Sequence, residues 1–145
     1  MQRCFFIGHR EPCDSLLPKL VHLINELITA HGVDEFIVGN YGGFDRIVLK
    51  ALKEIKRIHP SIRIVLLTPY QPNEPLLSDP TAIDEIMYPP DMECIPRRFA
   101  IIHANRYTID HVDFLVVYLK HTPSNTASFV RYALRRSDLT IIFLT

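Results

Sequence analysis

Short apolar runs alternate along this chain with longer segments in which apolar residues recur every three or four positions. Unbroken short apolar runs are typical of strands that are buried on both faces, as they are in parallel sheets. We therefore predict about five strands, at Cys4–Ile7, Phe36–Val38, Ile62–Leu67, Phe114–Leu119 and Thr140–Leu144.

The longer segments have the spacing of helices with an apolar stripe. The first begins near Leu16, after a capping residue at Asp14 or Ser15, and Gly32 ends it. Three further helices are predicted, from about Asp45 to His59, from Ile95 or Pro96 to Asp110, and around Phe129 to Leu134. Strands that alternate with crossover helices predict an α/β fold: a Rossmann-like open, mostly parallel sheet of about five strands with helices on both faces.

The segment 69–96 differs from the rest because it holds seven of the eleven prolines. We predict a mostly irregular insertion there, with a short edge strand between Ile83 and Tyr88, since proline-flanked segments pair only at an edge. An insertion of this length is either a lid or binding loop or a solvated excursion. Residues 1–145 otherwise read as one domain, without a repeat or a linker.

The composition argues against a membrane protein and against a cysteine-based site. The apolar runs are far shorter than the roughly 20 residues that cross a bilayer, and Cys4–Ile7 is too short for a signal-peptide core. We therefore expect no membrane partner and a cytoplasmic location. The cysteines at 4, 13 and 94 cannot all pair and form no Cys-x-x-Cys spacing, so we expect neither a disulfide framework nor a metal site.

The charges balance, with 16 basic and 16 acidic residues. A chain without net charge has no general attraction to a polyanion, so we do not expect a long nucleic acid as partner. Six arginines could still gather after folding, or could simply form solvated helix faces. They are Arg97, Arg98, Arg106, Arg131, Arg135 and Arg136.

Three of the five glycines lie between the second predicted strand and the helix after it, at Gly39, Gly42 and Gly43. Gly42 and Gly43 allow positive φ and close approach of a ligand, and the first amides of the helix carry the positive end of its dipole. This turn could hold a phosphate. Alternatively, the glycines only make a tight connection, with Asn40 or Asp45 as helix cap. The pattern is neither the Gly-x-Gly-x-x-Gly dinucleotide fingerprint nor a P-loop, so it identifies no cofactor.

Ligands of open parallel sheets bind outside the carboxyl ends of the strands. That rule selects the loops after four predicted strands, at 8–11, 39–45, 68–70 and 122–126. Together with a polar pair in the helix before Asp110, these loops supply our candidate binding residues. They are Gly8, His9, Arg10, Gly39, Asn40, Gly42, Gly43, Phe44, Asp45, Tyr70, Asn105, Arg106 and Thr126.

Several candidates have a plain structural alternative. Arg10 could bind a phosphate through two hydrogen bonds, or bridge Glu11 or Asp45. His9 could transfer protons near neutral pH or only form a hydrogen bond. Tyr70 could stack on a base or pack between prolines, and Asn105 with Arg106 could face solvent. For any catalysis the candidates are His9, Glu11 and Asp45.

Motifs along nearly the whole chain resemble one family. Cys-Phe-Phe-Ile-Gly-His-Arg-Glu at 4–11, Gly-Asn-Tyr-Gly-Gly-Phe-Asp at 39–45, Pro-Tyr at 69–70, Asn-Arg-Tyr-x-Ile-Asp at 105–110 and Thr-Ala-x-x-x-x-Tyr-Ala at 126–133 are similar to the YpsA-like, unknown-function branch of the SLOG superfamily. That superfamily includes the LOG phosphoribohydrolases and the DNA-processing DprA proteins. The resemblance implies a Rossmann-like domain that binds a nucleotide or a nucleotide-derived ligand at the glycine motifs.

Two departures from the family matter. Ser124-Asn125-Thr126 replaces a Gly-Gly-Thr, and Phe129 stands where LOG enzymes carry an acidic residue. Phenylalanine transfers no proton, so the key group of a LOG-type mechanism is missing. We therefore expect a protein that binds a small nucleotide-type ligand, for instance as a sensor or regulator, with a homo-oligomer as one possible assembly. One alternative is a hydrolase or transferase acting on an N-glycosidic or phosphate bond of a small nucleotide, and a weaker one is a DNA-associated module.

Overall fold

The structure, a computed structural model, describes residues 2–9, 12, 15–40, 42–70, 82–120 and 124–144. The predictions made for Arg10, Glu11 and Asp14 lie outside these residues. Within the described part of the chain, six strands form one sheet in the order β4-β3-β2-β1-β5-β6, and every neighbouring pair is parallel. The strands are β1 (Gln2–Gly8), β2 (Val33–Val38), β3 (Arg63–Leu67), β4 (Glu85–Met87), β5 (Phe114–Tyr118) and β6 (Thr140–Leu144).

This sheet confirms the predicted Rossmann-like α/β fold, with one strand more than the five expected. The additional strand is β4, the short edge strand anticipated between Ile83 and Tyr88. Side-chain interactions help to attach β4 to the sheet. Lys56 forms an ion pair with Asp84, and Arg63 forms one with Glu85. The Asp84 carboxylate also accepts a hydrogen bond from the Ile64 amide at 2.8 Å.

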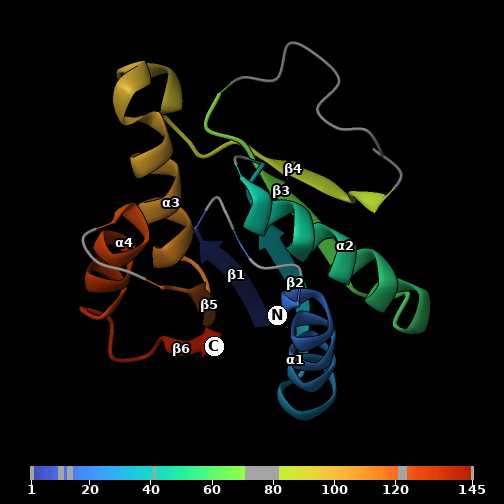
Figure 1. The fold of residues 1–145 in the computed structure, drawn as a ribbon. Coiled ribbons are helices and arrows are strands. Elements are labelled where there is room, and N and C mark those ends of the chain that lie inside the picture. Colours follow the sequence, from blue (N-terminus) through green and yellow to red (C-terminus); the bar gives the residue numbers. More distant parts are fainter. Residues whose placement is uncertain are drawn as a thin grey trace.

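Helices cover both faces of the sheet (Figure 1). They are α1 (Leu16–His31), α2 (Gly43–Ile58), α3 (Ala100–Asp110) and α4 (Asn125–Ala133), with short 3-10 turns η2 (Met92–Cys94) and η3 (Arg97–Phe99) before α3. None of the helices in the described ranges is long and apolar enough to cross a membrane.

Two apolar clusters explain why the strands are unbroken apolar runs. Cys4 and Phe6 of the central strand β1 belong to the cluster under α1 and α2, whereas Phe5 and Ile7 belong to the one under α3 and α4. Successive side chains of a strand point to opposite faces, so a strand covered on both sides must be apolar throughout. Cys4 is fully buried, and this burial raises the pKa of its thiol.

The helix ends differ in detail from the predictions. Gly32 ends α1 with a φ of 68°, as the sequence predicted. Ser15 occupies the N-cap position of α1 without a side-chain cap bond. Gly42 is the N-cap of α2 in an extended conformation, with φ −176°. Gly42 therefore does not use the positive φ that a glycine allows, and neither Asn40 nor Asp45, the predicted alternatives, is the N-cap of α2.

Four apolar residues of the predicted helical segments are solvent-exposed instead of packed in the core. They are Ile58 at the end of α2, Phe99 in η3, Ile102 in α3 and Leu134 at the C-cap of α4. Periodicity identified their helices, but it could not tell where each helix projects beyond the sheet.

Candidate functional site

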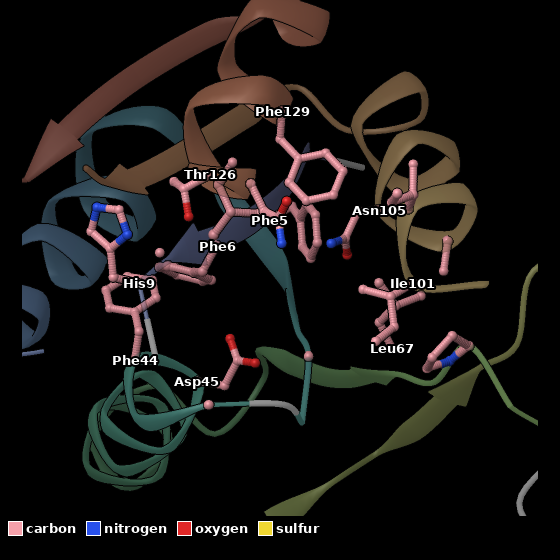
Figure 2. A pocket seen from close by; sticks show the side chains of 18 of the residues that line it. Phe5, Phe6, His9, Phe44, Asp45, Leu67, Ile101, Asn105, Thr126 and Phe129 are labelled. Carbon is pink, nitrogen blue, oxygen red and sulfur yellow. The ribbon is translucent and has the colours of Figure 1, made fainter. Parts of the chain in front are cut away.

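A cavity of about 390 Å³ lies at the carboxyl edge of the sheet (Figure 2). Its volume falls in the range of small-molecule sites, roughly 300–1,000 Å³. The ends of β1, β2 and β3, the beginnings of α2 and α4, and the η3–α3 segment surround it. The lining residues are Phe5, Phe6, Ile7, Gly8, His9, Gly39, Gly42, Phe44, Asp45, Leu67, Pro69, Arg98, Ile101, Ile102, Ala104, Asn105, Asn125, Thr126 and Phe129.

The position of the cavity follows from the topology. The chain leaves β1 and β2 toward helices on one face of the sheet, and it leaves β5 toward α4 on the other face. Where neighbouring connections diverge in this way, a crevice opens outside the strand ends. The beginnings of α2 and α4 therefore meet at one cavity from opposite faces. Each supplies first-turn amides without intrahelical acceptors and the positive end of a helix dipole.

Gly8 has a clear packing role at the floor of the cavity. A Cβ at this position would lie 2.5 Å from Cδ2 of Phe44, closer than real contacts allow. The Phe44 ring is buried and stacks on Tyr118 with ring centroids 5.7 Å apart. The glycine thus lets the first turn of α2 sit directly over the end of β1.

Asp45 is the acidic side chain among the described lining residues. Its carboxylate points from the first turn of α2 into the cavity, across from Thr126 (Figure 2). A Cβ added to Gly39 would lie 3.1 Å from Asp45 Oδ2, so this glycine leaves room for the carboxylate. An acidic side chain is also favourable in the first turn of a helix.

His9 lines the cavity with an imidazole whose Nε2 accepts the Lys120 amide at 2.7 Å. Because this amide is a donor, Nε2 keeps its lone pair toward it and carries no proton. A proton transfer at Nε2 would cost this bond. Of the catalytic candidates, Asp45 and His9 line the cavity, while Glu11 lies outside the described residues.

The α4 side of the cavity is polar at the start of the helix and apolar behind it. Ser124 caps α4 through its Oγ, which accepts the Ala127 amide at 3.0 Å. Asn125 and Thr126 in the first turn line the cavity, as does Phe129 one turn later. The position at which the family resemblance would place an acidic group is therefore an apolar wall.

Some candidates from the sequence do not line the cavity. Asn40, Gly43, Tyr70 and Arg106 are absent from its described lining, although Asn40 and Gly43 flank residues that belong to it. The ring of Tyr70 packs against Arg97, whose guanidinium carbon lies 4.2 Å from the centroid of that ring. Arg10 lies outside the described residues.

Among the residues that the structure describes, Arg98 is the arginine that lines the cavity. The sequence singled it out only as one of six arginines. Neighbours on η3 and α3 point elsewhere: Arg97 lies over Tyr70, and Arg106 lies over Tyr132 of α4, 4.9 Å from the ring centroid. The apolar lining includes Phe5 and Leu67, which lie in predicted buried strands, and Ile101, which the sequence pattern does not single out. Only the three-dimensional arrangement separates it from other apolar positions.

Positive charge gathers in the segment that forms η3, α3 and α4. Residues 95–136 contain seven basic and two acidic residues, whereas the remainder contains nine basic and fourteen acidic ones. Arg106 and Arg135 both lie over the Tyr132 ring, which joins α3 to α4. We call Arg97, Arg98, Arg106, Arg131 and Arg135, all exposed, the α3/α4 basic surface.

Two features limit this surface. Asp110 forms an ion pair with Arg135 and accepts a hydrogen bond from the Tyr132 hydroxyl at 2.7 Å. The pKa of Tyr132 is raised, mainly by burial and secondly by this hydrogen bond. Arg136 has a structural role, since its Nη1 donates to the carbonyls of Ile109 and Val112 at 2.6 and 2.8 Å. It closes the end of α3 and is not part of the basic surface.

Comparison with protein families finds no match for this chain, and no curated protein matches it. Among solved structures, the chain is similar to DNA processing protein A from Helicobacter pylori, whose structure was described for its single-stranded DNA binding mode. The TM-score is 0.69 at 18% identity, and the match covers 99% of this chain and 65% of that one. At this identity the likeness shows the fold, and this chain spans less than two thirds of its neighbour.

The likeness corrects one expectation from the sequence. We did not expect a long nucleic acid as partner because the net charge is zero, yet a protein with this fold binds single-stranded DNA. The expectation is wrong because a net charge is a sum over the chain. Residues 95–136 keep a local excess of positive charge, because most of the acidic residues that balance it lie elsewhere in the sequence.

Proposed function

We propose that the cavity binds a nucleotide or a nucleotide-derived ligand, with a phosphate group between the beginnings of α2 and α4. The observation that carries this proposal is the meeting of two helix N-termini at one cavity whose rim also holds Arg98. Backbone amides and a guanidinium are the groups that proteins use to bind phosphate.

The other polar side chains suit the rest of a nucleotide. The Asp45 carboxylate can accept hydrogen bonds from ribose hydroxyls, as acidic residues do in related open sheets. The amide of Asn105 both donates and accepts, so it can pair with the edge of a base. Apolar walls such as Phe129 and Ile101 offer surfaces for a base to pack against.

Calorimetric titration with nucleosides and their mono-, di- and triphosphates tests the proposal. Arg98→Gln should lower nucleotide affinity about ten- to a hundredfold, the value of one charge-assisted hydrogen bond. Arg106→Gln is the matched control, because Arg106 lies over Tyr132 and outside the described cavity lining. Equal losses in both variants would contradict the site, and failure of every nucleotide to bind would end the proposal.

A second candidate is binding of single-stranded nucleic acid, with one nucleotide of the strand in the cavity. The α3/α4 basic surface favours it, since the surface begins at the cavity with Arg98 and continues over α3 and α4. The structural neighbour described for its single-stranded DNA binding adds support at the level of fold. Exposed arginines beside aromatic rings such as Tyr132 and Phe99 are the elements of single-strand sites.

One arginine substitution separates the two candidates. A strand that crosses the basic surface should bind less tightly after Arg106→Gln and should lose affinity steeply with salt. A small ligand in the cavity should not respond to this substitution. Strand affinity that is unchanged in the variant would exclude a path over α3 and α4.

Membership in the YpsA-like branch of the SLOG superfamily, a cytoplasmic location and a role as sensor or regulator remain parts of this proposal. The enzymatic alternative rests on Asp45, which is the carboxylate at the cavity among the described residues. Incubation of the protein with each nucleotide, followed by chromatography of the products, distinguishes turnover from simple binding. Products that persist in Asp45→Asn would remove Asp45 as the acid or base.

A further inference from the structure

We propose that the edge strand β6 pairs with β6 of a second copy of this chain, in antiparallel orientation, so that two sheets join into one. The inference goes beyond ligand binding and does not depend on the cavity. It follows from the composition of this edge, from the direction of its backbone groups and from the exposure of Phe143.

The two edges of the sheet, β4 and β6, lie at opposite ends of it and differ in their protection against pairing (Figure 1). Natural proteins protect an edge strand by keeping it short, or by placing charges, proline or a bulge on it. β4 has three residues, among them the charged Glu85, and Pro89 and Pro90 follow it closely. β6 is the five-residue run Thr-Ile-Ile-Phe-Leu, which has no charge and no proline and keeps a regular register with β5. This edge therefore lacks the features that usually block pairing.

The backbone of β6 offers hydrogen-bonding groups on its outer side. The Thr140 amide donates to the Asp113 carbonyl at 3.1 Å, so Thr140 directs its backbone groups toward β5. Alternate residues of a strand bond to the same neighbour, so Ile142 also bonds to β5, whereas the N–H and C=O groups of Ile141 and Phe143 point away from it. Within the described residues, no other strand pairs with this side of β6.

A second copy of β6 matches these groups under a two-fold axis. Antiparallel pairing centred on Ile142 places Ile141 of each copy opposite Phe143 of the other. Each of these pairs exchanges two backbone hydrogen bonds, and the two Ile142 residues meet as a non-hydrogen-bonded pair with Cα atoms about 4.5 Å apart. Because the same strand serves both copies, the interface is isologous and closes at a dimer.

The side chains fit the same register. Ile141 packs against the cluster under α3 and α4, and Phe143 lies on the same face because alternate residues of a strand share a face. Phe143 is 51% exposed. Pairing lays each Phe143 ring beside Ile141 of the second copy, and an aromatic residue opposite a β-branched one is a favourable cross-strand pair. A register shifted by one residue would set Phe143 opposite Ile142, whose backbone groups already bond to β5.

Analytical ultracentrifugation over a range of protein concentrations tests the dimer. We expect a reversible equilibrium between monomer and dimer. Phe143→Arg should raise the dimer dissociation constant at least about tenfold, because the ring contact is lost and charges are placed on the edge. Ile58→Arg is the matched control, since Ile58 is 68% exposed at the end of α2 and takes no part in the sheet. Circular dichroism verifies that both variants remain folded.

Cysteine cross-linking tests the register. Ile142→Cys should form a disulfide-linked dimer after oxidation, because a disulfide spans Cα distances of about 4.4–6.8 Å. Phe143→Cys should not link to its own copy, since the two positions lie diagonally across the pair, about 7–8 Å apart or more. Peptide mass spectrometry distinguishes a link at position 142 from one through the exposed Cys94.

Four results would overturn the proposal. They are a wild-type chain that stays monomeric, a dimer that survives Phe143→Arg, a dimer that Ile58→Arg weakens equally, and a link through position 143 instead of 142.

Discussion

Substitution of Gly8 by alanine tests the contact on which the α2 side of the cavity is built. The new Cβ would lie 2.5 Å from Cδ2 and 2.6 Å from Cγ of Phe44. Phe44 is 1% exposed and stacks on Tyr118, so its ring cannot swing into solvent. Overpacking of this kind costs roughly 1–3 kcal/mol.

An opposing effect reduces this cost. Gly8 is not in the left-handed region, which among the described glycines is occupied by Gly32. Alanine therefore fits the backbone and gains about 0.4–1 kcal/mol by restricting the unfolded chain. We expect Gly8→Ala to lower the free energy of unfolding by about 1–2 kcal/mol, or the melting temperature by roughly 2–8 °C. It should also weaken nucleotide binding, because the first turn of α2 must shift.

Urea unfolding of a double-mutant cycle isolates the contact. The second substitution, Phe44→Ala, removes the ring at a cost of about 3–5 kcal/mol. In that background Gly8→Ala should cost nothing or stabilise slightly, which gives a coupling energy of about 1–3 kcal/mol.

Gly32→Ala serves as the comparison for the cycle. A Cβ there meets no atom within 4 Å, but φ is 68°. It should cost about 1–2 kcal/mol through the backbone alone, without coupling to Phe44. The reasoning would be refuted by a Gly8→Ala variant within about 0.5 kcal/mol of wild type, or by equal costs in the two backgrounds.

Three further predictions concern stability and reactivity. Arg136→Met should destabilise the fold by about 1.5–3 kcal/mol, because two carbonyls near the end of α3 lose a charged donor, while calorimetry should show unchanged nucleotide affinity. Burial alone would raise the pKa of Asp84, but the hydrogen bonds from Lys56 and the Ile64 amide outweigh it and the net pKa is lowered. The stabilisation of the fold by Asp84 is therefore present above the ordinary carboxyl pKa of 3.8 and is lost as the pH falls through the lower pKa of the folded state. The urea midpoint of Asp84→Asn should depend less on acid pH than that of the wild type. Identical pH profiles would exclude this contribution. Iodoacetamide followed by peptide mass spectrometry should modify exposed Cys94 quickly and buried Cys4 only after unfolding, and rapid modification of Cys4 in the folded protein would contradict its burial.

The sequence by itself determined the class of fold and the edge of the sheet that carries the cavity. Apolar runs flanked by helical periodicity define buried parallel strands, and parallel strands place their following loops at one edge. For that reason the predicted loops supply Gly8, His9, Gly39, Gly42 and Asp45 to the cavity lining. These inferences need only local patterns and the general rules of sheet topology.

Tertiary structure alone decided which side chains meet. Arg98 and Arg106 have the same chemistry and lie in one helical segment, yet one lines the cavity and the other lies over Tyr132. Gly8 is required by Phe44, a residue far away in the sequence. The zero net charge did not indicate the basic surface, because a sum over all residues does not say where the charges lie. Contacts and fields depend on distances in space, and those distances are set only when the helices pack against the sheet.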